Sequence, residues 1–156
     1  YKTEGIGSVG QALCTKAGGI NIAADMSKSQ VVDPEWVIEQ NPDVIIQSVG
    51  SKLPAGYDVD NLTAMEDVWN KTISRPELQN VTAVKDKRVY LIASDIYHTN
   101  IQSIISIAYM AKWLHPDLFK DLDPKAIHQE YLERFQKIDY DLDKHGAFVY
   151  PPVEGN

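Results

Sequence analysis

The sequence VVDPEWVIEQNPDVIIQSV, residues 31–49, predicts a helix that is followed directly by a buried strand. Asp33 is placed to cap the helix, Pro34 takes its first position, and Glu35 lies near the positive end of the helix dipole. The helix must end near Gln40, because an Asn-Pro pair comes next. The short apolar run DVIIQSV then predicts a buried strand, as found in sheets that helices cover.

The same alternation of helices and strands continues on both sides of this unit. Further helices are predicted at 8–16 (capped by Ser8), 64–72, 101–114 and 124–138, with a short helical turn after Ser74, and further strands at 21–24 and 88–93. The C-terminal tail from Phe148 is predicted to be irregular. This order predicts one α/β domain over residues 1–156, a three-layer α/β/α sandwich with a mainly parallel central sheet.

The last two long helices each carry apolar residues at helical spacing. Ile101, Ile104 and Ile105 begin the apolar side of the first of them, which predicts a core element. In the second, Phe135 and Ile138 belong to the predicted apolar stripe. His128 lies on the same helix and is predicted to be solvated.

Charge and composition argue against several classes of function. The formal net charge is −7, and no cluster of Lys and Arg opposes it, so nucleic acid is not a predicted partner. The four histidines are widely spaced and show no metal-ligand pattern, which predicts no metal site. No G-x-S-x-G elbow occurs, and the single cysteine, Cys14, is predicted to be a packing residue. We therefore predict no catalytic residue, no cofactor and no enzymatic activity.

One motif keeps an alternative open. The stretch GIGSVG fits the dinucleotide-binding template through Gly5, Gly7 and Gly10, and Asp25 follows where a ribose-binding carboxylate would stand. A Rossmann-like dinucleotide-binding enzyme domain is thus the alternative interpretation. The residues before Gly5 are short and polar, however, where the template requires a hydrophobic strand.

The predicted sheet indicates where a ligand would bind. In open α/β sheets, ligands bind outside the carboxyl ends of the strands. Here those ends are residues 4–8, 48–57 and 94–99. The free N–H groups at the start of the helix that Ser8 caps point to the same side and could contact an acidic ligand group.

Four ordered motifs also carry a family resemblance. They are GSVGQALCTKAGGINIA (7–23), VVDPEWVIEQNPDVII (31–46), LQNVTAVKDKRVYLI (78–92) and LHPDLF (114–119). Together they resemble the C-terminal lobe of the substrate-binding proteins that serve ABC importers of iron-siderophores, haem and vitamin B12. The resemblance covers nearly the whole chain. It implies a protein of two α/β lobes joined by one long helix, with this chain starting after that helix and without the N-terminal lobe.

The resemblance assigns roles to particular residues. Glu35 matches the glutamate with which the C-terminal lobe docks on arginines of the ABC permease. The cleft between the lobes would hold an iron chelate, haem or a corrinoid. On this lobe, the ligand-binding candidates are Gly7, Ser8, Tyr57, Asp95, Tyr97, His98 and Thr99.

The resemblance also bears on ligand class and location. The segment before Glu35 has Ser29 and Gln30 where B12-binding relatives can place a Trp, which weakens the case for a corrinoid. No arginine cluster faces the predicted cleft, so a strongly anionic catecholate siderophore is disfavoured. The implied location is extracytoplasmic, in the periplasm or on the outer face of the cell membrane.

Overall fold

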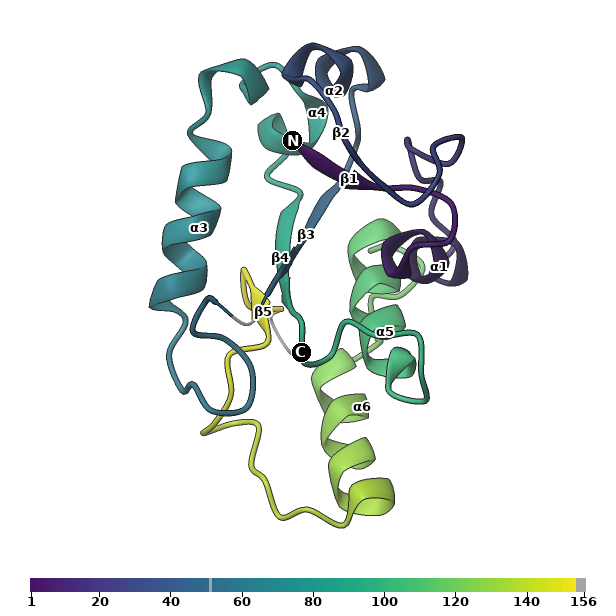
Figure 1. Cartoon of the computed structure of the whole chain (residues 1–156). Coiled ribbons are helices and arrows are strands. Elements are labelled where there is room, and N and C mark those ends of the chain that lie inside the picture. Colours follow the sequence, from purple (N-terminus) through teal and green to yellow (C-terminus); the bar gives the residue numbers. More distant parts are fainter. Residues whose placement is uncertain (51, 154–156) are drawn as a thin grey trace.

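The computed structural model describes residues 1–50 and 52–153. It confirms the predicted α/β class and its three layers (Figure 1). Helix α3 (Thr63–Ile73) covers one face of the central strands β3 (Ile45–Val49) and β4 (Val89–Ala93). Helices α5 (Ser103–Leu114) and α6 (Pro124–Glu130) cover the other face, with α1 (Val9–Lys16) beside α5.

The central sheet is mixed and has β4 in the middle. Strands β3 and β4 are parallel, with register Ile45↔Val89 through Val49↔Ala93. The chain then returns to add β5 (Val149–Tyr150) antiparallel to β4. The prediction of an irregular tail is therefore wrong at these two residues, because β4 offers them a free edge to pair with.

Strand β4 is buried on both of its faces. Leu91 and Ile92 point to opposite faces, and each is 0% exposed. Leu91 packs with Val49 and Met65 in the cluster under α3, whereas Ile92 belongs to the larger cluster under α5. A strand with apolar neighbours on both faces needs the continuous apolar run that the sequence shows.

A second, two-stranded sheet lies at the N-terminus. Strand β1 (Lys2–Glu4) pairs antiparallel with β2 (Ser29–Val31). The strand predicted at 21–24 is wrong, because this segment forms turns. The side chain of Asn21 organises them: its Oδ1 accepts from Ala23 N at 3.0 Å, and its Nδ2 donates to Glu4 O at 2.6 Å. The first of these bonds is local and competes with strand formation, and the second joins the turns to the distant strand β1.

Helix α2 (Pro34–Gln40) has the predicted bounds but not the predicted cap. Asp33 stands at the N-cap position without a side-chain capping hydrogen bond. At the other end Asn41 adopts a left-handed conformation, and its Oδ1 accepts from Thr82 N at 2.9 Å, at the start of the short helix α4 (Thr82–Lys85). The short 3₁₀ helix η1 (Pro76–Leu78) begins at Pro76, but its N-cap residue is Arg75, so the predicted cap at Ser74 is wrong.

The predicted apolar sides of the last two long helices need correction. Helix α5 begins at Ser103, which leaves Ile101 in the preceding loop at 75% exposed, and Ile104 is also exposed. After α6 the chain continues as the π-helical segment η2 (Tyr131–Gln136). A π turn is wider than an α turn, so the residues within it and after it are rotated relative to an α-helical pattern. Phe135 is accordingly 68% exposed, and Ile138 also reaches the surface.

Arg88 joins the two ends of the β4–α5 unit. Its guanidinium Nη2 donates to the carbonyls of Trp113 at 2.8 Å and Leu114 at 3.2 Å, at the C-terminus of α5. These carbonyls have no partner within the helix, and the positive charge complements the negative end of the helix dipole. Nearby, the rings of Tyr90 and Trp113 stack with centroids 4.6 Å apart.

His128 is buried, so its predicted solvation is wrong. Its side chain is 0% exposed, and its Nε2 lies 2.7 Å from the Tyr57 hydroxyl. The rings of Tyr57 and Phe148 pack edge-on against it. Burial lowers the pKa of His128 from 6.5 to about 4, because a charged imidazole would lose its hydration.

We expect this histidine to make stability fall at acid pH. Between about pH 6.5 and 4 the unfolded chain protonates His128 and the folded chain does not, so the free energy of unfolding decreases as pH falls through this window. The loss is on the order of 3 kcal/mol by pH 4. Urea unfolding at pH 7, 5.5 and 4.5 measures it. His128→Gln should flatten the dependence, whereas the exposed-site control His98→Gln should keep it. An equal slope in His128→Gln would contradict the assignment.

Candidate functional site: three loops at the carboxyl edge

The loops that follow β3 and β4 are bound to each other. Ser94 N donates to Val49 O at 2.9 Å, and the Asp95 carboxylate accepts from Tyr57 N at 3.2 Å. Gly56 permits this approach, since its φ is +98° and a Cβ there would collide with the Asp95 carboxylate. Asp95 therefore fixes the position of the loop at residue 57 against the end of β4.

The end of β1 is bound to the same segment through Tyr97. The Tyr97 hydroxyl donates to Glu4 Oε2 at 3.2 Å, and the backbone N–H of Gly10, in the first turn of α1, donates to the same oxygen. Burial raises the pKa of Tyr97, and the Glu4 carboxylate raises it further, so this phenol keeps its proton. Tyr97 thus links three elements: β1, α1 and the loop after β4.

This arrangement opposes the dinucleotide interpretation. The motif does form a strand-to-helix turn, with Gly7 at φ +81° and Ser8 Oγ accepting from Gln11 N at 3.1 Å. However, the donor of Gly10, which a phosphate would need, is already bonded to Glu4. A carboxylate in that position would repel a pyrophosphate. Gly10 instead provides space, because a Cβ there would meet Glu4 and Tyr97.

The predicted ligand-binding residues therefore fall into two groups. The side chains of Asp95 and Tyr97 form bonds within the lobe, whereas His98 and Thr99, directly after them, are exposed. Tyr57 is half-buried with its hydroxyl bonded to His128, and burial raises its pKa to about 12. Gly7 is exposed and Ser8 is half-buried at the start of α1.

Glu4 is the residue of this site that sequence reasoning missed. It lies at the end of β1, one residue before the glycine run, and it accepts hydrogen bonds from two other elements. A polar residue at the end of a short polar strand gave no signal of that role. The sequence does place residues 4–8 at the end of a strand, but the candidates taken from that segment are Gly7 and Ser8.

Among the hollows that the described residues line, two are relevant to a binding site. One, of about 410 Å³, sits at the carboxyl end of β3 and is lined by Gln47, Ser48, Val49, Gly50, Lys52, Leu53 and Val68. It adjoins the loop after β3, on the edge where the sequence predicts ligand.

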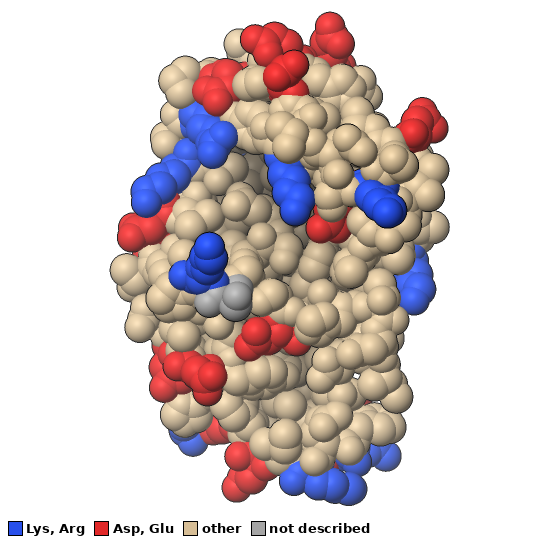
Figure 2. Space-filling view, viewed as in Figure 1, with Lys and Arg blue, Asp and Glu red and all other residues tan. Residues whose placement is uncertain are grey.

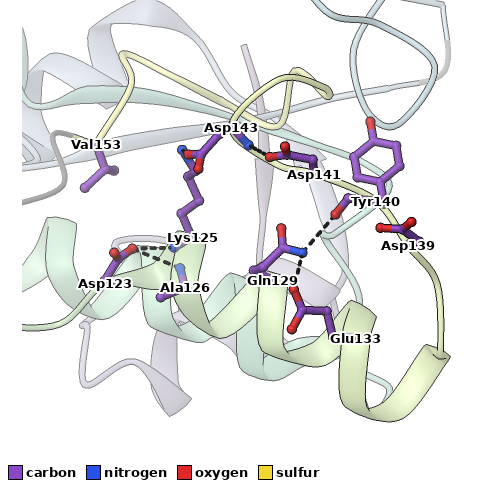
Figure 3. Close-up of a pocket in the computed structure, with 10 residues that line it drawn as sticks. All are labelled: Asp123, Lys125, Ala126, Gln129, Glu133, Asp139, Tyr140, Asp141, Asp143 and Val153. Atoms are coloured by element: carbon purple, nitrogen blue, oxygen red, sulfur yellow. Dashed lines mark hydrogen bonds and ion pairs between the residues drawn. The ribbon is translucent and has the colours of Figure 1, made fainter.

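The other hollow, of about 610 Å³, lies between α6 and residues 139–143 (Figure 3). Half of its ten lining residues are Asp or Glu, and much of its hydrogen bonding is internal: Gln129 Nε2 donates to Glu133 at 2.8 Å, and Asp123 caps α6. Within residues 1–50 and 52–153, no group of three or more His, Cys, Asp or Glu side chains is arranged to hold a metal ion.

Glu35 lies away from these loops. It is exposed in the first turn of α2, and Figure 2 shows acidic side chains gathered at the end of the molecule where α2 lies. In the part of the chain that the structure describes, no helix combines the length and the apolar character needed to cross a membrane.

Comparison with known proteins identifies relatives of one kind. Residues 1–96 match the family model described as periplasmic binding protein. The molybdate-binding protein MolA of Haemophilus influenzae is 27% identical over 146 residues, which cover 90% of this chain and 38% of that protein.

Solved structures that resemble this chain are also periplasmic binding proteins. The TroA-like periplasmic binding protein FepB from Veillonella parvula superposes with a TM-score of 0.78 at 26% identity, over 99% of this chain and 44% of that one. MolA bound to molybdate gives a TM-score of 0.66 at 26% identity, over 90% and 40%. The chain thus spans about two fifths of the length of these relatives.

The close approach of the Glu4 and Tyr97 side chains to Gly10 can be tested by substitution. A Gly→Ala change inside a helix ordinarily stabilises by about 0.5–1 kcal/mol. At Gly10 we expect the opposite, a net loss of about 1 kcal/mol, because the methyl group would push aside the ends of the Glu4 and Tyr97 side chains and break the hydrogen bonds that Glu4 accepts. Gly50→Ala is the control, since a Cβ there has no neighbour within 4 Å. Urea unfolding compares the two, and a stabilised Gly10→Ala protein would show that the contact is not as described.

Proposed function

This chain belongs to the periplasmic binding protein family, and on that premise we propose that it is the C-terminal lobe of a substrate-binding protein of an ABC importer. Proteins of this family work outside the cytoplasmic membrane, and the chain is extracytoplasmic. In the proposal it captures a solute and makes or breaks no covalent bond. A second lobe encloses the ligand, and the loops at the carboxyl edge of this lobe form one wall of the cleft.

We further propose that the ligand is an iron chelate, haem or a corrinoid. One observation supports the position of the cleft above all. The loops after β1, β3 and β4 meet at one edge through Asp95 and Tyr97, and the next residues, His98 and Thr99, are exposed there. An exposed imidazole at such an edge can ligate a metal centre or bond to a ligand carboxylate.

Docking on the permease is the second part of the proposal. Glu35 is an exposed carboxylate on the first turn of α2, and Pro34 at the first helical position restricts the backbone beside it. A carboxylate held in this way can accept two parallel N–H···O bonds from an arginine guanidinium. The acidic surface around α2 would attract a basic permease surface and speed the encounter.

The ligand and the role of His98 can be tested together. Native mass spectrometry of the protein at its natural length, purified from its own source, should show a retained metal complex. His98→Ala should lower its affinity about tenfold or more, as the loss of one direct contact implies. His145→Ala is the control, because His145 is also exposed but bonds to Asp60 at 3.1 Å. Equal affinities in the two variants would remove His98 from the site.

Docking can be tested separately. In cells that carry the transporter, Glu35→Ala should reduce uptake several-fold while ligand affinity stays unchanged, because the change affects only the contact with the permease. Glu39→Ala provides the control: it removes another exposed carboxylate of the same helix. Unchanged uptake and unchanged permease affinity in Glu35→Ala would exclude the docking role.

A further inference from the structure

We infer that Glu4 determines the charge class of the ligand: it places a fixed carboxylate at the cleft edge and selects neutral or cationic metal complexes against anions. The inference rests on the proposed function, because it requires the ligand to lie at the edge that the three loops form. It goes further in naming one residue and the ligand property that this residue controls.

The first observation is how Glu4 is held. Its Oε2 accepts from the Gly10 N–H in the first turn of α1 and from the Tyr97 hydroxyl. The absence of a side chain at residue 10 gives both partners room. The carboxylate is therefore anchored from two elements rather than lying free at the surface, and its charge stays at this edge.

The second observation is which donors Glu4 uses. The N-terminus of a helix attracts anions through its free N–H groups and its dipole. At α1, the Gly10 N–H donates to Glu4 and the Gln11 N–H donates to Ser8 Oγ. The phenolic proton of Tyr97 is also directed to Glu4. The lobe thus satisfies the Gly10 N–H and the Tyr97 hydroxyl with its own carboxylate, and the Gln11 N–H with its own hydroxyl.

The third observation is the charge of the surrounding loops. Residues 4–10 and 94–102 contain Glu4 and Asp95 but no Lys or Arg, whereas the loop after β3 carries Lys52 in the hollow at the end of that strand. Asp95 is held as Glu4 is, by the N–H of Tyr57. A ligand at this edge therefore meets two carboxylates and the imidazole of His98, without a fixed positive charge from either loop.

These observations predict how ligands are ranked. Complementarity favours an uncharged or cationic complex, such as a ferric tris-hydroxamate, over a dianion or a ferric tris-catecholate. The relative MolA has bound molybdate, a dianion, so membership of the same family does not set the charge of the ligand. In this chain we assign that selection to Glu4.

The decisive variant is Glu4→Gln in the protein at its natural length. The glutamine amide oxygen can accept from Gly10 N–H and Tyr97 O–H, so the substitution removes the charge and keeps the geometry. Calorimetry would measure binding of three probes: a neutral ferric tris-hydroxamate, a ferric tris-catecholate and molybdate. We expect the wild type to prefer the neutral complex, and Glu4→Gln to shift the ratio of affinities toward the anions by about tenfold.

Salt dependence and a control separate a charge effect from a structural one. The difference between wild type and Glu4→Gln should shrink as ionic strength rises, because salt screens exposed charges. Glu39→Gln makes the same chemical change on α2 and should leave the ratio unaltered.

Two sets of results would overturn the role of Glu4. If the wild type binds molybdate or the tris-catecholate as tightly as the neutral complex, or if Glu4→Gln leaves the ratio unchanged, the role of Glu4 is refuted and solute capture stands. If none of the three probes binds and Glu35→Ala leaves uptake unchanged, both this inference and the proposed function are refuted.

Discussion

The burial of β4 on both faces is the constraint on which the rest of the structure depends. Leu91 faces the cluster under α3 and Ile92 the cluster under α5, so neither layer of helices can be moved without exposing the strand. The strand therefore ends at a defined point, and the loop after it starts from a fixed position. In α/β proteins the functional residues lie on loops at this edge. The strands beneath these loops fix the positions of the residues.

Within the loop after β4, neighbouring residues have different tasks. Asp95 and Tyr97 turn back into the lobe and bind the loops after β3 and β1, whereas His98 and Thr99 stay at the surface. A residue near a cleft can thus matter by placing another side chain. Glu4 adds a third role, since it accepts from the Gly10 N–H at the start of α1 and so connects β1 with that helix.

Sequence reasoning worked where local chemistry and burial agree. The α/β class, β3, β4, and the bounds of α2 all followed from apolar runs and helix signals that the tertiary structure leaves unchanged. It failed where a distant partner decides the outcome. Residues 21–24 became turns because Asn21 bonds to Glu4, Val149 and Tyr150 became a strand because β4 offers an edge, and His128 became buried because Tyr57 reaches it. The two bonds that Glu4 accepts depend on loops that meet only in the folded chain. No local pattern encodes such contacts.

The contact between Arg88 and the end of α5 has a consequence for the energetics of recognition. Arg88 stands just before β4 and bonds to carbonyls at the far end of α5. The start of the strand is therefore joined to the end of the helix, and the loop between them is held at both ends. Both anchor points of the loop at 94–102 are therefore set before any ligand arrives. A binding surface that is already ordered loses little conformational entropy on association, and more of the contact energy appears as affinity. Rigidity at a site remote from the ligand would in this way contribute to how tightly the lobe holds it.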